Sequence, residues 1–256
     1  MKLCRFIVPG SSTPRSGVIE RDTIAEIHGE IWGARERTGE KFRVDGVRFV
    51  TPASPSKIVC VGRNFKAHAT ELGNELPKEP MIFLKPPSAV IAPGDAIVMP
   101  SVSKRVDYEG ELALIIGRQC RHIGSSDNVN DFIAGYTCLN DVTLRDLQKT
   151  DGQWWRAKGF DTSCPFGPIV DTELDPGATV ETFVNGFRKQ SASIADLIFP
   201  VDVIIRWIAQ VMTLEPGDVV AMGTPEGVGP LAAGDTVEVA ISGIGTLRNT
   251  VVAAQA

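Results

Sequence analysis

A short turn unit recurs in front of the apolar runs of this chain. An apolar residue, any residue, then Pro, Gly and Asp occur at 91–95 and 214–218, and looser versions occur at 174–177 and 231–235. Proline followed by glycine suits a type II turn that leads into a strand. Because the segments between the units differ in length, we interpret them as repeated turn chemistry and not as an internal repeat. The pattern predicts a chain built mostly from strands.

Helical periodicity is confined to a few stretches. It covers 127–134, 143–149 and 200–212, and one further helical turn begins with Asn64 as its cap. Asn185-Gly186 is a hairpin signal between two short runs of strand character. No glycine fingerprint for a dinucleotide or a nucleoside triphosphate is present. The expected fold class is therefore α+β and strand-dominated, without alternating βαβ units.

The chain divides near residue 56. Residues 1–56 have the pattern of a small β-rich module that ends in a Pro- and Ser-rich linker at 51–56, and residues 57–256 form a larger second domain. Within the module, short strands are expected near 3–8, 17–20 and 25–33. The larger part begins with a buried strand at 57–62.

Composition excludes several classes of protein. The 256 residues are 43% hydrophobic, which suffices for a real core, and the net charge of −5 argues against nucleic acid or an anionic membrane as a partner. Five widely spaced cysteines without a CxxC pair predict reduced thiols and a cytoplasmic location, not a disulfide framework. The N-terminal apolar run is too short for a signal peptide, and no stretch reaches membrane-spanning length.

Two carboxylates stand two residues apart in a run that otherwise has the pattern of a buried strand. Since strand side chains alternate, Glu109 and Glu111 point the same way, and Ala113 and Ile115 continue that face. Such like charges require either a raised pKa or a cation between them, and a hard divalent ion suits oxygen ligands. A solvated edge strand with alternate exposed glutamates is the alternative interpretation.

A third carboxylate, Asp141, lies where the next apolar run ends, just before a helix that Thr143 would cap. It can complete a three-oxygen site with Glu109 and Glu111 and leave positions open for water and substrate, as Mg²⁺ or Mn²⁺ prefers. Taken alone, Asp141 is equally well explained as a turn or capping residue.

The chain resembles the fumarylacetoacetate hydrolase superfamily from residue 57 to about 250. Six motifs occur in the family's order: Val-Cys-Val-Gly-Arg-Asn-Phe at 59–65, Phe-Leu-Lys-Pro at 83–86, Asp-Tyr-Glu-Gly-Glu at 107–111, Asn-Asp-Val-Thr-Leu-Arg-Asp at 140–146, Lys-Gly-Phe-Asp-Thr-Ser-Cys-Pro at 158–165 and Met-Gly-Thr-Pro-Glu-Gly-Val-Gly at 222–229. The resemblance implies a large mixed sheet rolled into a barrel-like core, a homodimer, and Mg²⁺ or Mn²⁺ held by Glu109, Glu111 and Asp141. A fold alone does not fix the reaction.

The resemblance also implies a set of substrate-binding residues. Lys158 matches the family's active-site lysine, which could polarise a carbonyl or carry a proton, and Arg63 and Lys85 belong to motifs that line the pocket. Thr224 would offer its hydroxyl and backbone N–H to the first carboxylate of a 2-oxo acid. Arg145 and Gln148, three residues apart on a short helix, share a face and could bind a distal carboxylate.

His68 and Glu71 are the acid–base candidates. Their spacing of three puts them on one helical face, where the carboxylate can orient the imidazole. In hydrolytic members of the family a matching pair lies on a mobile lid and activates water. A solvated helical face is the alternative explanation of the pair.

These residues lead to a main functional hypothesis and two competitors. The main hypothesis is hydrolysis of a carbon–carbon bond in an acylpyruvate-like 2,4-dioxo acid, which gives pyruvate and a carboxylic acid. The second is isomerisation, tautomerisation or decarboxylation of a 2-oxo or 2-hydroxy-diene dioate, such as oxaloacetate or the 2-hydroxyhepta-2,4-diene-1,7-dioate of aromatic catabolism. Both need a stabilised enolate. The third is a metal-stabilised binding protein without activity.

Overall fold

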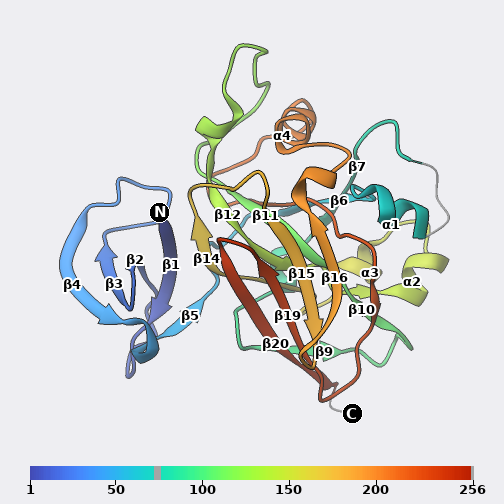
Figure 1. Ribbon diagram of the computed structural model, residues 1–256, viewed down its shortest axis with the longest axis horizontal. Helices are drawn as coiled ribbons and strands as arrows, with labels where there is room; N and C mark the ends of the chain where they lie inside the picture. Colours follow the sequence, from blue (N-terminus) through green and yellow to red (C-terminus); the bar gives the residue numbers. More distant parts are fainter. Residues whose placement is uncertain (72–75, 255–256) are drawn as a thin grey trace.

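The computed structural model describes residues 1–71 and 76–254, apart from the side chains of residues 68–70. Strands dominate and helices are short, as the sequence predicts (Figure 1). The helices are α1 (Lys66–Glu71), α2 (Arg145–Thr150), α3 (Trp155–Lys158) and α4 (Val201–Ala209), with 3-10 turns at Val44–Gly46, Pro87–Ala89, Val129–Phe132 and Ile194–Asp196.

The largest sheet has twelve strands, of which ten form one continuous path. In spatial order these are β4 (Arg37–Arg43), β3 (Thr23–Ile27), β2 (Arg15–Glu20), β1 (Lys2–Ile7), β14 (Cys164–Asp171), β12 (Ile133–Asn140), β11 (Gly110–Ile116), β17 (Val219–Ala221), β6 (Ile58–Gly62) and β7 (Met81–Lys85). Two strands lie off this path: β5 (Arg48–Val50) pairs with β1, and β8 (Val90–Ile91) pairs with β14. The β17–β6 and β14–β8 pairs are parallel, so the sheet is mixed.

Two smaller sheets complete the strand set. One has the order β16 (Phe187–Ser193), β15 (Thr179–Val184), β19 (Thr236–Ile241), β20 (Gly245–Ala253) and β9 (Ala96–Met99), and the other has β13 (Thr143–Leu144), β10 (Val106–Tyr108) and β18 (Gly229–Pro230). Among the described residues the two end strands of the large sheet, β4 and β7, do not pair with each other. The mixed, strand-dominated fold is thus observed, whereas closure into a barrel is not confirmed.

The two faces of β11 pack into different parts of the core. Leu112, Leu114 and Ile116 belong to a cluster that joins the large sheet to β15, β19 and α4, while Ala113 and Ile115 belong to a second cluster with β1 and β14. All of these side chains are buried. The alternation that the sequence predicts for this strand is therefore confirmed, and Glu111 lies on the face of Ala113 and Ile115.

The N-terminal strands extend the large sheet. β1 pairs with β14 of the larger part through Lys2 to Cys4, so hydrogen bonds cross the expected boundary near residue 56. In Figure 1 the strands β1 to β4 lie at one end of the molecule, and α1, α2 and α3 lie at the other. The first three N-terminal strands begin close to the expected places. Residues 28–33, expected as part of the third strand, lie outside β3, and β4 and β5 were not predicted from the sequence.

The recurrent turn unit forms the expected turn at three of its four places, whereas Gly177 in the version at 174–177 does not have a positive φ. Gly94, Gly217 and Gly234 have φ of 87°, 90° and 96°, as the third position of a type II turn requires. The Asp that follows each glycine accepts a hydrogen bond from the backbone N–H three residues earlier, at 2.7 to 2.9 Å. The Asn185-Gly186 turn is also confirmed, with φ of 53° and 79° between β15 and β16.

One helix expectation was wrong, and two expected helices form with different bounds. Residues 127–134 form only a 3-10 turn before β12, because the apolar residues from Ile133 onward pair with β11. Thr143 and Leu144 pair with β10, so α2 begins at Arg145, and the Thr143 hydroxyl donates to the Asp141 carbonyl and does not cap the helix. The helix at 200–212 is confirmed but shorter, as α4.

Asn64 does not cap the helix after it. Its side-chain Nδ2 donates to the carbonyls of Phe199 and Met222, and its Oδ1 accepts from the Phe199 N–H. The residue is fully buried. Its polar atoms therefore fasten the end of β6 to two distant segments, a role that helix spacing cannot reveal.

Candidate functional site

Three acidic side chains meet at the junction of β10, β11 and β12. Glu109 lies in the one-residue gap between β10 and β11, Glu111 lies on β11, and Asp141 directly follows β12. Because Gly110 pairs with Asn140 across the two strands, Asp141 comes to lie beside Glu109, and its N–H donates to the Glu109 carbonyl at 2.8 Å.

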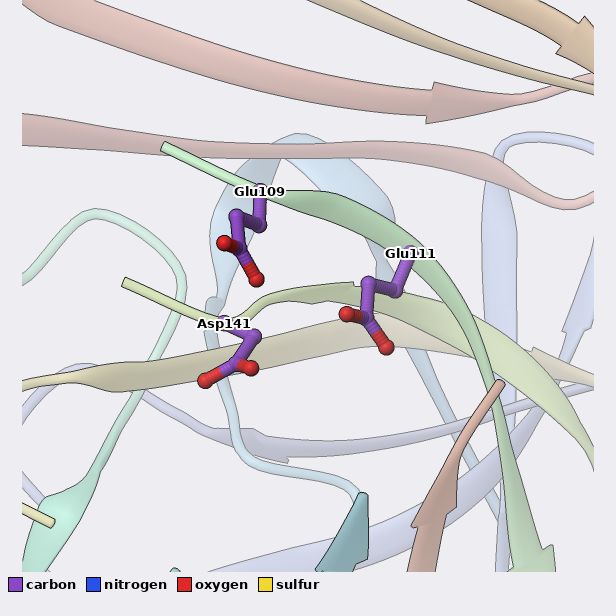
Figure 2. Close-up of side chains that lie close together, drawn as sticks. All are labelled: Glu109, Glu111 and Asp141. Atoms are coloured by element: carbon purple, nitrogen blue, oxygen red, sulfur yellow. The ribbon is translucent and has the colours of Figure 1, made fainter. Parts of the chain in front are cut away.

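The carboxylates converge on one point, as Figure 2 shows. Each of Glu109, Glu111 and Asp141 offers an oxygen, and the three oxygens lie within 4.8 Å of one another. All three residues are buried, with 5%, 2% and 0% of their surface exposed. Buried like charges at this distance exclude the alternative of a solvated edge strand and require compensation by cations or protons.

A buried hydrogen-bond network fixes the backbone around Gly110, the residue between the two glutamates. Its N–H donates to Gln190 Oε1 at 3.0 Å, and its carbonyl accepts from the Thr224 hydroxyl at 2.9 Å. Gln190 Nε2 donates in turn to Thr224 Oγ1 at 2.8 Å. A Cβ atom on Gly110 would lie 2.0 Å from Thr182 Oγ1, so only glycine fits here.

Further backbone contacts hold the glutamates themselves. The Glu109 N–H donates to Asn140 Oδ1 at 3.0 Å, and the Gly223 N–H donates to Glu111 Oε2 at 2.8 Å. The partner residues lie on β12 and in the loop after β17. The two glutamates are thus held by two separate segments of the chain.

Cationic side chains neutralise part of this charge. Lys158 Nζ donates to Glu109 Oε2 at 2.7 Å and to Asp141 Oδ2 at 2.5 Å, and Lys85 Nζ donates to Asp141 Oδ1 at 2.6 Å. Arg145 donates through Nη2 to Glu109 Oε1 at 2.5 Å. Lys85, Arg145 and Lys158 are themselves buried, so these are ion pairs in a water-poor environment.

Burial and charge move two pKa values at the centre. Burial raises the pKa of Glu111 well above its usual range, and the Asp141 and Glu109 carboxylates raise it further. Burial would lower the pKa of Lys158, but the Asp141 and Glu109 charges outweigh it and hold that pKa above the ordinary value. Lys158 is therefore a cation at neutral pH, whereas Glu111 favours its neutral form until a cation arrives.

The site opens into a cavity of about 360 Å³. The cavity is lined by Val61, Gly62, Arg63, Met81, Phe83, Glu109, Glu111, Asp141, Arg145, Gln148, Lys149, Trp154, Lys158 and Thr224. Phe83 and Trp154 stand edge to face with ring centroids 5.4 Å apart, and Lys158 Nζ lies 5.0 Å from the Phe83 centroid. The cavity lining thus contains aromatic and apolar side chains as well as the three carboxylates, and Lys158 contacts both kinds of group.

The acidic group fits a hard divalent ion. Three carboxylate oxygens within reach of one another, on separate backbone segments, are the donor type of a Mg²⁺ or Mn²⁺ site. The group borders the cavity, so positions for water and substrate would stay open. The pKa of Glu111 is raised because its negative charge is poorly compensated, and a bound cation would compensate it.

Most of the expected substrate residues lie at this cavity. Arg63, Arg145, Gln148, Lys158 and Thr224 line it. Arg145 is already engaged, since Nε donates to Asp107 at 2.8 Å and Nη1 donates to Gln148 in addition to the Glu109 contact.

Two expected residues lie elsewhere, and one falls outside the description. Lys85 does not line the cavity but lies behind Asp141, with 1% of its surface exposed. Glu71 accepts from the Gly227 N–H at 3.1 Å and is not a lining residue. His68 falls within α1, and its side chain is outside the described part of the structure.

Sequence reasoning missed several residues of the site. Asn140, Gln190 and Gly223 hold the backbone or carboxylates of the acidic group, and Asp107 accepts from both Arg105 and Arg145. Asp107 and Asn140 stand next to the acidic residues in their motifs, which was an available signal. Gln190 carried none, because it lies on β16, far from every motif.

Family comparisons match nearly the whole chain. The model for fumarylacetoacetate (FAA) hydrolase, C-terminal, matches residues 57–252, and a model described as Rv2993c-like, N-terminal, matches residues 1–52. A protein of Methanocaldococcus jannaschii is 48% identical over 229 residues, which are 84% of this chain and 96% of that protein. An oxaloacetate tautomerase of Bacillus subtilis is 42% identical over 212 residues, which are 77% of this chain and 70% of that protein.

Solved structures agree with these relatives. A 5-carboxymethyl-2-hydroxymuconate delta-isomerase of Mycobacterium smegmatis has a TM-score of 0.92 and 42% identity, covering 99% of this chain and all of that one. A 2-hydroxyhepta-2,4-diene-1,7-dioate isomerase of Mycobacterium marinum has a TM-score of 0.90 and 43% identity, and the match covers all of both chains. A maleylpyruvate hydrolase of Sphingobium, in complex with manganese(II) and pyruvate, has a TM-score of 0.80 and 32% identity. This match also covers both chains fully.

Proposed function

This chain belongs to the fumarylacetoacetate hydrolase family, and on that premise we propose that it is a divalent-metal-dependent tautomerase or isomerase of a 2-oxo or 2-hydroxy-diene dioate. The observation that carries the proposal is the buried group of Glu109, Glu111 and Asp141 at the end of a cavity, beside the charged Lys158. The names of the tautomerase and isomerase relatives favour this reaction class over hydrolysis, which was our main hypothesis from the sequence.

Glu109, Glu111 and Asp141 would hold Mg²⁺ or Mn²⁺. When bound, the ion supplies positive charge next to the oxygen that becomes negative in an enolate. Both ions accept carboxylate ligands. The related maleylpyruvate hydrolase binds manganese(II), and for this chain we propose either ion.

The chain's own residues would supply orientation and proton transfer. Lys158 keeps its proton because two carboxylates surround its ammonium group, so it acts as a donor to a substrate oxygen and not as a base. The backbone N–H of Thr224 would bind the first carboxylate, since the Thr224 hydroxyl already donates to Gly110 and accepts from Gln190. His68 and Glu71 stay the proposed acid–base pair. A proton leaves the carbon beside the keto group, a proton returns to oxygen or to another carbon, and no water is consumed.

Hydrolysis of an acylpyruvate-like substrate is the second candidate. It is favoured by the likeness to the maleylpyruvate hydrolase and by the motif that contains His68 and Glu71. In that reaction water adds across the bond between C3 and C4, which yields pyruvate and a carboxylic acid. Decarboxylation of oxaloacetate would release carbon dioxide and leave the same type of enolate, which a proton would then convert to pyruvate.

One set of assays separates these reactions. Oxaloacetate, acetylpyruvate and 2-hydroxyhepta-2,4-diene-1,7-dioate are supplied with Mg²⁺ or Mn²⁺, ultraviolet absorbance follows the enol or diene, and NMR identifies the products. We expect a tautomer or isomer of equal composition and no activity in Glu111→Gln. Pyruvate with a second acid from acetylpyruvate would establish hydrolysis, and full activity of Glu111→Gln would overturn the metal-site proposal.

Further parts of the proposal concern the whole protein. We propose a homodimer, a cytoplasmic location, a role in aromatic catabolism, and a separate N-terminal module at residues 1–56 beside the catalytic domain at 57–256. No helix within the described ranges is long and apolar enough to cross a membrane. Light scattering tests the dimer, and limited proteolysis between residues 51 and 56 tests the module boundary.

A further inference from the structure

Two cationic residues at the cavity have no counter-charge among the residues that the structure describes. Arg63, directly after β6, and Lys149, in the last turn of α2, both line the cavity. Neither side chain makes a hydrogen bond or an ion pair with any residue in 1–71 or 76–254. Unlike Arg145 and Lys158, they are available to a ligand.

We propose that Arg63 and Lys149 bind the second carboxylate of the substrate, so that the enzyme selects a dioate over a 2-oxo acid with an uncharged tail. The inference rests on the proposed function for the other end of the substrate, where the first carboxylate and the 2-oxygen are bound. It gives Lys149 a role that no motif indicated, and it moves the expected distal contact away from Arg145.

The charge balance of the site supports this assignment. The buried carboxylates of Asp107, Glu109, Glu111 and Asp141 are surrounded by the cations Lys85, Arg105, Arg145 and Lys158. With all eight groups ionised these two sets carry equal numbers of formal charges, and a neutral Glu111 leaves the site more positive still, so the positive charge of Arg63 and Lys149 is in excess. A divalent ion would increase that excess. A doubly charged substrate restores the balance better than a singly charged one.

Arg63 is held in place by its backbone. Its φ of 57° lies in the left-handed region, which is unusual for arginine and costs conformational free energy. The next residue, Asn64, accepts from Ile198 N–H at 2.7 Å through its carbonyl and makes the side-chain bonds to Phe199 and Met222. The anchored Asn64 therefore maintains the strained turn. The turn thus fixes the place where the Arg63 side chain leaves the backbone, and its planar guanidinium presents several donors to a carboxylate.

The apolar side of the cavity suits the carbon chain of such a substrate. Met81, Phe83 and Trp154 line it, and the edge-to-face contact of the two rings keeps them together. A conjugated chain gains free energy against aromatic surfaces. The cavity thus combines a carboxylate cluster, an apolar surface and two unpaired cations, which is the complement of a dioate.

An ordinary structural explanation exists for Lys149. A lysine in the last turn of a helix interacts favourably with the helix dipole, and this would explain the residue without any ligand. The two explanations differ in what they expect of ligand selectivity. If Lys149 only stabilises the helix, its replacement changes the affinity for all ligands alike. If Lys149 binds substrate, its replacement weakens mainly the binding of ligands with a charged tail.

Binding of two matched probes tests the inference through affinity and not through turnover. 2-Oxoadipate and 2-oxohexanoate have equal chain length and differ in a terminal carboxylate or methyl group. Titration calorimetry with Mg²⁺ present should give wild-type protein a roughly tenfold to hundredfold lower Kd for 2-oxoadipate, as charge-assisted hydrogen bonds produce. In Lys149→Met that preference should fall about tenfold, and Lys149→Glu should lower it further.

Matched variants separate the explanations. Lys104→Met removes an exposed lysine that does not line the cavity and should keep the wild-type preference. If Lys149→Met weakens both probes equally, or if the wild type does not distinguish them, the inference is wrong. Preference for the charged tail together with no turnover of any assayed oxo acid would retain the inference and reject the proposed function. Turnover of an assayed oxo acid without a preference for the charged tail would retain the proposed function and reject the inference.

Discussion

Lys158 and Asp141 form a fully buried ion pair in which Nζ lies 2.5 Å from Oδ2, and the same ammonium also reaches Glu109. Asp141 is one of the three expected metal ligands, so the lysine cation and the proposed divalent ion would be bound by the same carboxylates. The stability of the metal-free protein and its affinity for metal are therefore linked through one lysine side chain.

Replacement of Lys158 by methionine should make folding depend on metal. The Glu109 and Asp141 carboxylates would lose a buried counter-charge, which costs about 3–5 kcal/mol when one partner of a buried pair is removed. Urea unfolding with EDTA should show that loss, and Mg²⁺ should restore more stability in the variant than in the wild type. Lys158→Arg keeps the charge and serves as the control. Equal stability of the methionine variant and wild type in EDTA would contradict the pairing.

Loss of one acidic ligand should weaken metal binding. Glu111→Gln keeps the shape of the side chain but removes the charge, so we expect affinity for Mn²⁺ to fall more than about tenfold. Electron paramagnetic resonance of free Mn²⁺ measures this directly. The control is Glu173→Gln, which changes an exposed glutamate outside the cavity. Unaltered Mn²⁺ affinity in Glu111→Gln would show that the three carboxylates do not act as one site.

A side chain at Gly110 should disturb the site through Thr182. Gly110→Ala would place its Cβ 2.0 Å from Thr182 Oγ1, so we expect a loss of about 1–3 kcal/mol in unfolding free energy. Thr182→Ala should be mild, because within the described structure Oγ1 has no hydrogen-bond partner. Denaturant titration of the double variant should recover part of the loss. No recovery would mean that the steric contact is not the cause.

Asp218 should contribute to stability at neutral pH but not in acid. Burial opposes its charge, but hydrogen bonds from Lys57, the Glu215 N–H and Ser56 outweigh burial and hold the pKa of Asp218 below its ordinary value. A carboxyl group with a lowered folded-state pKa stabilises the protein above its unfolded-state pKa of about 3.9, and this contribution is lost as pH falls through the folded value.

The substitution Asp218→Asn tests that linkage. At pH 7 we expect it to reduce the unfolding free energy by about 3 kcal/mol, since hydrogen bonds to a buried charged group are lost. The difference from wild type should shrink below about pH 4. Chemical unfolding across this pH range is the measurement, and a difference that grows in acid would have the wrong sign for a lowered pKa.

Local sequence signals identified much of the site. Glu109 and Glu111 follow from strand alternation, and Asp141 follows from the end of an apolar run. These succeeded because side-chain direction in a strand and the place where a strand ends are local properties. The turns that contain Asp95, Asp218 and Asp235 could be predicted for the same reason, because each is formed by contacts between residues close in the chain.

Non-local contacts defeated the other expectations. Residues 127–134 have helical spacing, but pairing of β12 with β11 overrides it. Asn64 has the position of a helix cap, but its amide binds Phe199 and Met222, which no spacing rule can foresee. Lys85 belongs to a pocket motif, yet its ammonium lies behind Asp141. Each outcome depends on a partner that is distant along the chain: the partner is 17 residues away for Ile133, 56 for Lys85 and 135 or more for Asn64.

The amino-acid sequence by itself determined the family, the strand-rich fold class and the acidic residues at the centre, because motifs and periodicity are written along the chain. Only the tertiary structure decided how the charges are shared. Lys85, Arg145 and Lys158 are bound to carboxylates, while Arg63 and Lys149 line the cavity without an ion pair to any described residue. Ion pairing depends on distance through space and on burial, and folding alone sets both.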